Sequence, residues 1–239
     1  MRTFLLSFAL TATLCSISVP QVHGTRKLIV VISDQWTSAT GTLYLFDKTP
    51  NGWKQKKESW HVSLGDSGLA WGIGILKHPR GGRIKVEGDL CSPAGIFHIG
   101  KLYGLDENKP EGIRYPYHKI TSQTVCVDDA QSTSYNRIVE SNLVKIDWTS
   151  SEEMAKVVPD YKYVLVVKHN PDHEKGKGSC IFLHINNKPT TGCTSMDEEN
   201  MLILLRWLNP KKKTLIVQLP ETEYQQLRPR WKLPSLIPH

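Results

Sequence analysis

Cys193 and His184 are the two residues whose types and spacing could perform acyl transfer. Cys193 follows Gly192 and precedes an apolar pattern, typical of a helix, that begins with Ser195. A thiol near a helix start feels the positive end of the helix dipole and unpaired backbone N–H groups, which favour the nucleophilic thiolate. The same N–H groups, with the amide of Cys193 itself, could hold an oxyanion.

His184 lies nine residues before Cys193, at the end of an expected strand. A strand, a loop and a turn of that length can return the chain to its start, so His184 could take the thiol proton. Gly192 allows a sharp turn and a close approach to substrate. Two alternatives stay open: both side chains are merely packed, or Cys193 joins Cys180 in a disulfide that closes a short loop. The disulfide is less favoured, because strand alternation puts Cys180 and His184 on one face, with Cys180 in the core.

Short apolar runs between glycine and proline turns predict a mainly β fold with a few short helices, either a sandwich or a barrel. Pro50-Asn51-Gly52 is a hairpin turn, and Trp53 opens the returning strand. The other expected strands are 27–32, 41–46, 95–99, 163–167, 179–184 and 214–219.

Two patterns of a serine followed three residues later by a glutamate predict helix starts, at Ser150–Glu153 and at Ser195–Glu198. The first helix is expected to end before Pro159, and the second at Asn209-Pro210. Residues 221–239 carry three prolines and are expected to form an extended tail.

Residues 1–24 have the pattern of a secretory signal peptide. Arg2 supplies a positive charge, the run from Phe4 to Val19 is apolar apart from Ser and Thr, and small residues precede a cleavage point near Gly24. The apolar run is too short and too rich in hydroxyls for a good membrane anchor, and no later stretch is long and apolar enough. We therefore expect a secreted, periplasmic or extracellular protein without stable membrane insertion.

The net charge of +7 favours anionic partners such as cell-wall polymers, although a mild excess can simply serve solubility. The lysine clusters at 54–57 and 211–213 are not interleaved with aromatics, so we expect no nucleic-acid partner. Four cysteines follow the signal segment, and two disulfides could pair them in three ways. Their spacing forms no Cys-x-x-Cys zinc pair. These four are Cys91, Cys126, Cys180 and Cys193.

The run Pro189-Thr190-Thr191-Gly192-Cys193 after His184 resembles the active-site motif of L,D-transpeptidase catalytic domains (YkuD-like), in the branch with a Pro-Thr-x-Gly-Cys motif. Three further segments, 85–97, 126–136 and 169–184, resemble stretches of that branch in the same order. The resemblance covers roughly Lys27 to Val217.

This resemblance implies a β-sandwich of mixed sheets over residues 25–220, with the cysteine and the histidine in a cleft. It implies ping-pong acyl transfer on peptidoglycan stem peptides by a monomer, through a Cys193 thioester and without metal or organic cofactor. A hydrolase that uses the same pair is one alternative. A non-catalytic secreted module that binds cell-wall polymer is another. A papain-like protease is disfavoured, because there the cysteine precedes the histidine.

The matching positions also imply residues that bind substrate or hold an oxyanion. They are Gly192, Thr191, Thr194, Asn170, Tyr135, Asn136 and Arg137. Two alternatives stay open: Asn170, Tyr135 and Asn136 merely fix the loops of the cleft, and Arg137 is an ordinary surface arginine. Thr191 departs from the family pattern, since it stands where the common motif has histidine. No arginine follows Cys193, so Arg137 is a candidate for binding a substrate carboxylate. Cys91 could pair with Cys126. Glu87 and Asp89 are expected to hold a turn rather than to act as an acid pair.

Overall fold

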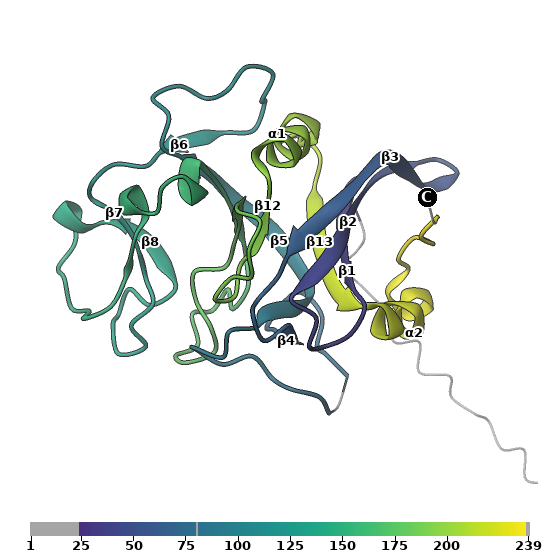
Figure 1. Cartoon of the computed structure of the whole chain (residues 1–239), viewed down its shortest axis with the longest axis horizontal. Helices are drawn as coiled ribbons and strands as arrows, with labels where there is room; N and C mark the ends of the chain where they lie inside the picture. The colour runs from purple at the N-terminus through teal and green to yellow at the C-terminus, as the bar shows by residue number, and fades with distance from the viewer. Residues whose placement is uncertain (1–23, 80, 238–239) are drawn as a thin grey trace, which may run out of the picture.

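The computed structural model describes residues 24–79 and 81–237, and these form a mainly β protein with a few short helices, as expected (Figure 1). The expected signal peptide falls almost wholly outside the described residues. The strands are β1 (Lys27–Ser33), β2 (Thr40–Thr49), β3 (Gly52–Ser63), β4 (Leu69–Trp71), β5 (Ser92–Gly104), β6 (Tyr117–Lys119), β7 (Thr124–Val127), β8 (Arg137–Glu140), β9 (Glu152–Glu153), β10 (Tyr163–Val167), β11 (Phe182–Ile185), β12 (Thr194–Met196) and β13 (Thr214–Pro220). The α-helices are α1 (Glu198–Trp207) and α2 (Glu221–Trp231), and 3-10 turns lie at Ser141–Leu143, Met154–Lys156 and Asp160–Lys162.

The large sheet has ten strands and closes on itself. Its order is β10-β11-β12-β3-β2-β1-β13-β5-β4, and β10 also pairs with β5, so that the strands from β10 to β5 form a barrel-like ring. Parallel pairs such as β1 with β13 occur beside antiparallel pairs such as β1 with β2, so the expectation of mixed pairing is confirmed. Where the resemblance implies two packed sheets, the structure has one closed sheet.

β1 lies at the centre of the core, and every one of its residues is buried. A strand paired in parallel and covered on both faces carries a continuous apolar run rather than an alternating one. The helix α1 adds buried Met201, Leu204 and Leu205 from one face. This packing fixes the barrel wall that carries β11 and β12.

The sequence expectations for residues 221–231 and 150–158 are wrong. Residues 221–231 form α2 rather than an extended tail, because Tyr224, Leu227 and Trp231 give a buried helical face that packs near β13 and β1. This burial outweighs the cost of Pro229 inside the helix. The expected helix at 150–158 is instead β9 followed by a 3-10 turn.

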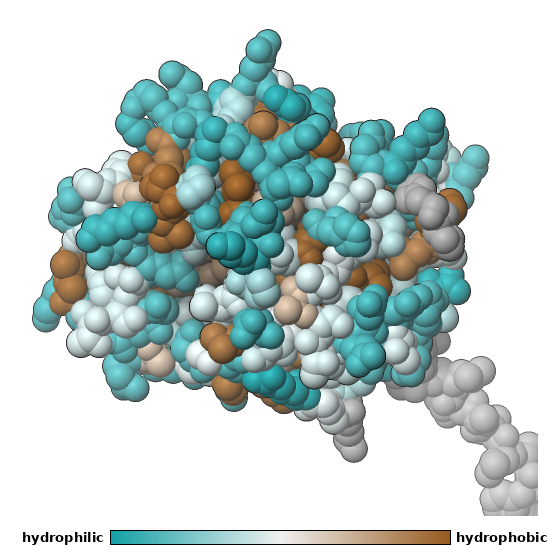
Figure 2. Space-filling model, in the orientation of Figure 1, coloured by the Kyte–Doolittle hydropathy of each residue, from teal (hydrophilic) through white to brown (hydrophobic). Residues whose placement is uncertain are grey.

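A small sheet, ordered β8-β7-β9, lies beside the barrel (Figure 1). The face of the molecule in Figure 2 is mostly hydrophilic, with small separate hydrophobic patches. None of the described helices is long and apolar enough to cross a membrane.

Candidate active site

The segments that carry His184 and Cys193 lie side by side. β11 holds His184, and β12 begins directly after Cys193 and runs parallel to β11. His184 pairs with Ser195, so Cys193 lies level with Phe182 on the neighbouring strand. At ordinary sheet spacings, this register places the Cα atoms of Cys193 and His184 about 8 Å apart. The chain therefore returns to its start, as the spacing predicts.

Tyr161 connects the surroundings of the two candidate residues. Its ring contacts Phe182 and His184 edge-on, with centroid distances of 5.7 and 5.4 Å. Tyr161, Phe182 and Cys193 belong to one buried cluster. The imidazole and the thiol thus border the same enclosed region of the barrel wall.

The thiol of Cys193 is buried and held by backbone groups. Sγ donates to the Cys180 carbonyl at 3.4 Å and accepts from the Phe182 amide at 3.3 Å. Burial raises the pKa of this thiol, and the Glu152 carboxyl raises it further, against the Phe182 N–H and the Lys85 charge. The resting group is therefore a neutral thiol, whereas the sequence analysis expects a favoured thiolate.

The position of α1 explains this difference. The helix begins at Glu198 after Asp197, whose side chain accepts from the Asn200 amide at 3.0 Å, so Ser195 is not its cap. β12 separates Cys193 from the helix. Because the field of a helix dipole falls off within about one turn, α1 does not stabilise a thiolate at Cys193.

Hydrogen bonds fix the backbone of Cys193 and of the turn at Thr190–Gly192 that precedes it. The Cys193 carbonyl accepts from the Ser92 hydroxyl at 2.7 Å and from the Thr190 hydroxyl at 2.6 Å. Gly192 has φ +152°, a conformation that other residues rarely adopt, and its amide donates to Thr190 Oγ1 at 3.1 Å. These bonds fix the orientation of the nucleophile candidate.

His184 is oriented through its Nδ1 atom, which lies 3.0 Å from the carbonyl of Ile185. A carbonyl can only accept, so this contact places the proton on Nδ1 and leaves Nε2 with a lone pair. Burial lowers the pKa of His184, while the Ile185 carbonyl and Asp160 oppose that shift. A neutral imidazole with a free Nε2 is the form that accepts a proton.

Among the described residues, no hydrogen bond joins the Cys193 thiol to His184. The thiol instead bonds the backbone of its neighbouring strand. Proton transfer between the two groups therefore requires the thiol to turn away from the Cys180 carbonyl toward the imidazole.

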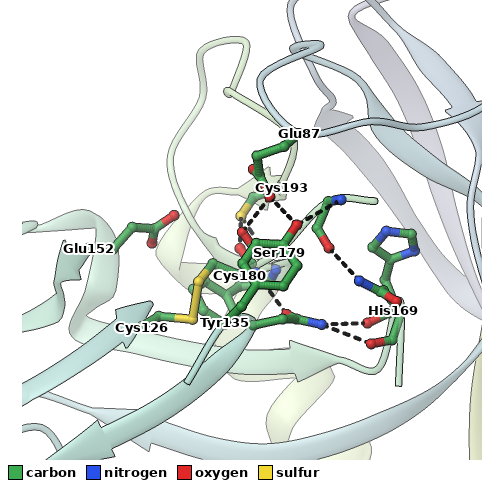
Figure 3. The surroundings of a disulfide bond; sticks show 12 residues. Glu87, Cys126, Tyr135, Glu152, His169, Ser179, Cys180 and Cys193 are labelled. Carbon is green, nitrogen blue, oxygen red and sulfur yellow. Dashed lines mark hydrogen bonds between the residues drawn. A yellow bond between two sulfur atoms is a disulfide. The ribbon is translucent and has the colours of Figure 1, made fainter. Parts of the chain in front are cut away.

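The disulfide pairs Cys126 with Cys180, so the expected Cys91–Cys126 pair is wrong (Figure 3). Cys193 is not bonded to Cys180, in line with the sequence argument that disfavours that bridge. Cys91 and Cys193 are free and buried, and Cys91 donates to the Ser67 carbonyl at 3.3 Å. The bond ties β7 of the small sheet to the segment before β11. Sequence spacing could not find it, because the partners are 54 residues apart.

Tyr135 belongs to a buried polar network beside the disulfide (Figure 3). Its hydroxyl donates to the Glu87 carboxylate and accepts from the Gly178 amide at 3.0 Å. Ser179 donates to the same carboxylate at 2.8 Å. With its hydroxyl engaged in this way, Tyr135 fixes loops rather than facing a substrate.

Asn136 and Asn170 also fix loops. Asn136 donates to the Asn170 carbonyl at 2.9 Å and accepts from the Cys180 amide at 3.0 Å. Asn170 is fully buried, and its side chain donates to the Glu174 carbonyl at 2.9 Å and to the Gly178 carbonyl at 3.2 Å. Asp89 holds a turn as expected, by accepting from backbone amides and from Lys85 at 2.8 Å.

The remaining candidates differ in exposure. Thr194 is buried and donates to Gln218 Oε1 at 2.6 Å, which makes it a packing residue. Thr191 and Arg137 are exposed. Of the matched positions, these two are the ones that leave their side chains accessible to a ligand.

Sequence reasoning missed Tyr161 and Glu152 near the thiol. The Tyr161 hydroxyl donates to the Glu152 carboxylate, and burial raises the pKa of Glu152 to about 7. Neither residue stands in a recognisable motif, so the sequence held no signal for them. Within the described residues, no group of three or more His, Cys, Asp or Glu side chains could hold a metal ion.

Comparisons with known proteins leave the family open. No family model and no curated protein matches the chain. Among solved structures, the helical cell shape determining protein Pgp2 from Campylobacter jejuni is similar, with a TM-score of 0.40 and 12% identity. The match covers 83% of this chain and 49% of that protein, so the chain spans about half its length. A similarity this low assigns no function, and any activity must be argued from the residues themselves.

Proposed function

We propose that this protein is a cysteine acyltransferase acting on peptidoglycan stem peptides, with Cys193 as nucleophile and His184 as general base. The observation that carries the proposal is the Nδ1 contact of His184 with the Ile185 carbonyl, on the strand beside Cys193. That contact leaves Nε2 as the proton acceptor in the region that the thiol borders. The ordered motifs shared with L,D-transpeptidases suggest the substrate class.

In the first half-reaction, the thiol turns toward His184 and passes its proton to Nε2. The sulfur attacks the carbonyl of the diaminopimelate-type residue at stem position three, and a carbon–sulfur bond forms. The carbon–nitrogen bond to D-alanine then breaks, and the imidazolium returns its proton to the leaving amine. The product is a Cys193 thioester.

The oxyanion of the tetrahedral intermediate needs N–H donors. The Gly192 amide is bonded to Thr190, so we assign the oxyanion to the Cys193 amide. The two hydroxyls on the Cys193 carbonyl hold the next peptide unit, between Cys193 and Thr194, and so restrict the backbone of Cys193. In the second half-reaction, the amine of another stem peptide attacks the thioester and restores the thiol.

A neutral resting thiol is compatible with this sequence of steps. Its raised pKa means that deprotonation occurs together with attack, with His184 as the acceptor, rather than before substrate binds. Loss of His184 should therefore lower the acylation rate by about 10²–10⁴-fold, the usual range for a general base.

The test is intact-mass analysis of the protein incubated with a muropeptide tetrapeptide or with a carbapenem. We expect an acyl adduct on wild type, none on Cys193→Ala, and slow formation on His184→Ala. Cys91→Ala is the matched control, because Cys91 is the other free buried thiol, and it should react like wild type. An adduct that persists in Cys193→Ala would refute the nucleophile.

The second half-reaction separates transfer from hydrolysis. Supplying an amine acceptor to the acylated protein should yield the cross-linked peptide. An adduct released only to water would make the protein a peptidoglycan hydrolase. Unreacted wild type would favour a binding module.

A further inference from the structure

A pocket of about 590 Å³ is lined by residues of the barrel and of the small sheet. It lies next to the disulfide that Figure 3 shows. Its wall includes residues of β5, β8, β10 and β11. Cys126 and Cys180 both line it, so the disulfide closes the pocket on one side.

The charge of this pocket has one sign. Lys101, Arg137 and Lys168 line it, all three are exposed, and no carboxylate is among the lining residues. Within residues 24–79 and 81–237, none of these three cations forms a salt bridge. Unpaired cations around a concave surface raise the local concentration of anions and favour their binding.

The rest of the lining is largely apolar. Val166 and Phe182 contribute side chains, and Gly100 lies against Val166 so closely that an added Cβ would be 2.9 Å from the valine Cβ. The glycine therefore lets β5 approach β10 at the pocket wall. An apolar surface with cations around it fits a ligand that has a short aliphatic part and an anionic end.

The pocket is separated from the candidate nucleophile by one strand segment. Cys180 and Phe182 line the pocket, and their backbone atoms hold the Cys193 thiol at 3.4 and 3.3 Å. Only the backbone of Cys180–Phe182 therefore separates a ligand in this pocket from the thiol. Asn136 fixes this wall through the Cys180 amide and precedes Arg137 in the chain.

We propose that this pocket is an anion subsite that binds a free carboxylate of the peptide processed at Cys193, through Arg137, Lys101 and Lys168. The inference rests on the proposed function, because it assigns the pocket to that substrate.

The test measures binding by calorimetry in the Cys193→Ala protein, which cannot turn over. The probe is an alanyl-γ-glutamyl-lysyl-alanine tetrapeptide with free carboxylates, compared with the same peptide in which every carboxylate is an amide. We expect the amide form to bind at least tenfold more weakly. Arg137→Gln, and the pair Lys101→Gln with Lys168→Gln, should weaken binding of the free carboxylate form by a similar factor and leave the amide form unchanged.

The matched control removes two exposed lysines from β3, by Lys54→Gln with Lys57→Gln. This pair carries the same change of charge outside the pocket and should bind the carboxylate peptide like the parent. Equal binding by the pocket variants and the parent would overturn the proposal. Equal weakening by the control pair would also overturn it, because it would mean that general charge attracts the peptide.

Acylation of wild type is recorded in parallel, so that the two proposals can fail separately. If wild type is acylated at Cys193 but the pocket variants bind the peptide normally, the proposed function stands and the proposed subsite is refuted. If the protein binds the carboxylate form more tightly than the amide form but is never acylated, the pocket binds anions without serving thiol chemistry. That result would refute both the proposed function and the assignment of the pocket to its substrate.

Discussion

Burial sets the protonation states of the candidate site residue by residue. Enclosure raises the pKa of Cys193 and lowers that of His184, so both groups rest in their neutral forms. A neutral thiol beside a neutral imidazole is less reactive toward stray electrophiles than a preformed ion pair. In the proposed reaction, substrate binding must therefore start the proton transfer.

Glu152 predicts a measurable pH dependence of stability. Burial holds its folded pKa at about 7, above the value of a free glutamate, so the folded state keeps a proton that the unfolded state releases. Stability from this group is thus present at low pH and is lost as pH rises toward 7, at about 1 kcal/mol per pH unit.

Urea unfolding of wild type and Glu152→Gln between pH 5 and pH 8 measures this effect. The difference between the two free energies of unfolding should change with that slope below pH 7 and level off above it. A constant difference across the range would show that Glu152 titrates normally.

Two neighbouring threonines give a further test of which candidates are structural. Thr194→Val leaves the buried Gln218 acceptor without its donor and should cost about 1–3 kcal/mol of unfolding free energy. Thr191→Val, at an exposed position, should change it by less than about 0.5 kcal/mol. Denaturant titration of both variants measures these changes. Equal losses of unfolding free energy would contradict the assignment of Thr194 as a packing residue and of Thr191 as an exposed one.

Among the elements, strands with continuous apolar runs were predictable. β1, β10 and β13 lie where the sequence predicts them, because buried strands need apolar residues at nearly every position. α2 was not predictable in the same way, since Pro229 inside it and the prolines after it indicate an extended segment. Its apolar spacing becomes informative only once the barrel offers a surface for that face. The closeness of His184 and Cys193 is local in sequence and could be predicted, whereas Tyr161 and Glu152 reach the site only through the fold.

The packing of α2 can be tested at one residue. Trp231 is buried at the end of the helix, and Trp231→Ala should cost about 3–5 kcal/mol of unfolding free energy. Gln226→Ala, on the exposed face of the same helix, should be nearly neutral. Chemical denaturation measures both, and a neutral Trp231→Ala would mean that the tail does not dock.

For the whole molecule, the disulfide is the one covalent cross-link, besides the main chain, that joins the small sheet to the barrel wall among the described residues. Peptide mapping without reduction should find Cys126 joined to Cys180, with Cys91 and Cys193 free. Because the bond closes a loop of 54 residues, Cys126→Ser with Cys180→Ser should lose about 4 kcal/mol of unfolding free energy.

Cys91→Ser is the control for that measurement, since it removes a cysteine without opening a loop. Adding reductant to wild type should reproduce the loss seen in the double variant. A map that joins Cys91 to Cys126 would contradict the pairing.

The hydroxyl of Ser92 ties the backbone of Cys193 to a segment that is distant in the sequence. It accepts from the Gly65 amide at 2.8 Å and donates to the Cys193 carbonyl at 2.7 Å, while the Thr190 amide bonds the Leu64 carbonyl at 2.9 Å. The carbonyl of Cys193 and the turn before it are thus held by two distant parts of the chain, residues 64–65 and Ser92. In the reaction proposed above, a partly folded chain carries the cysteine but lacks this support, so only the completed fold presents the nucleophile in its working position.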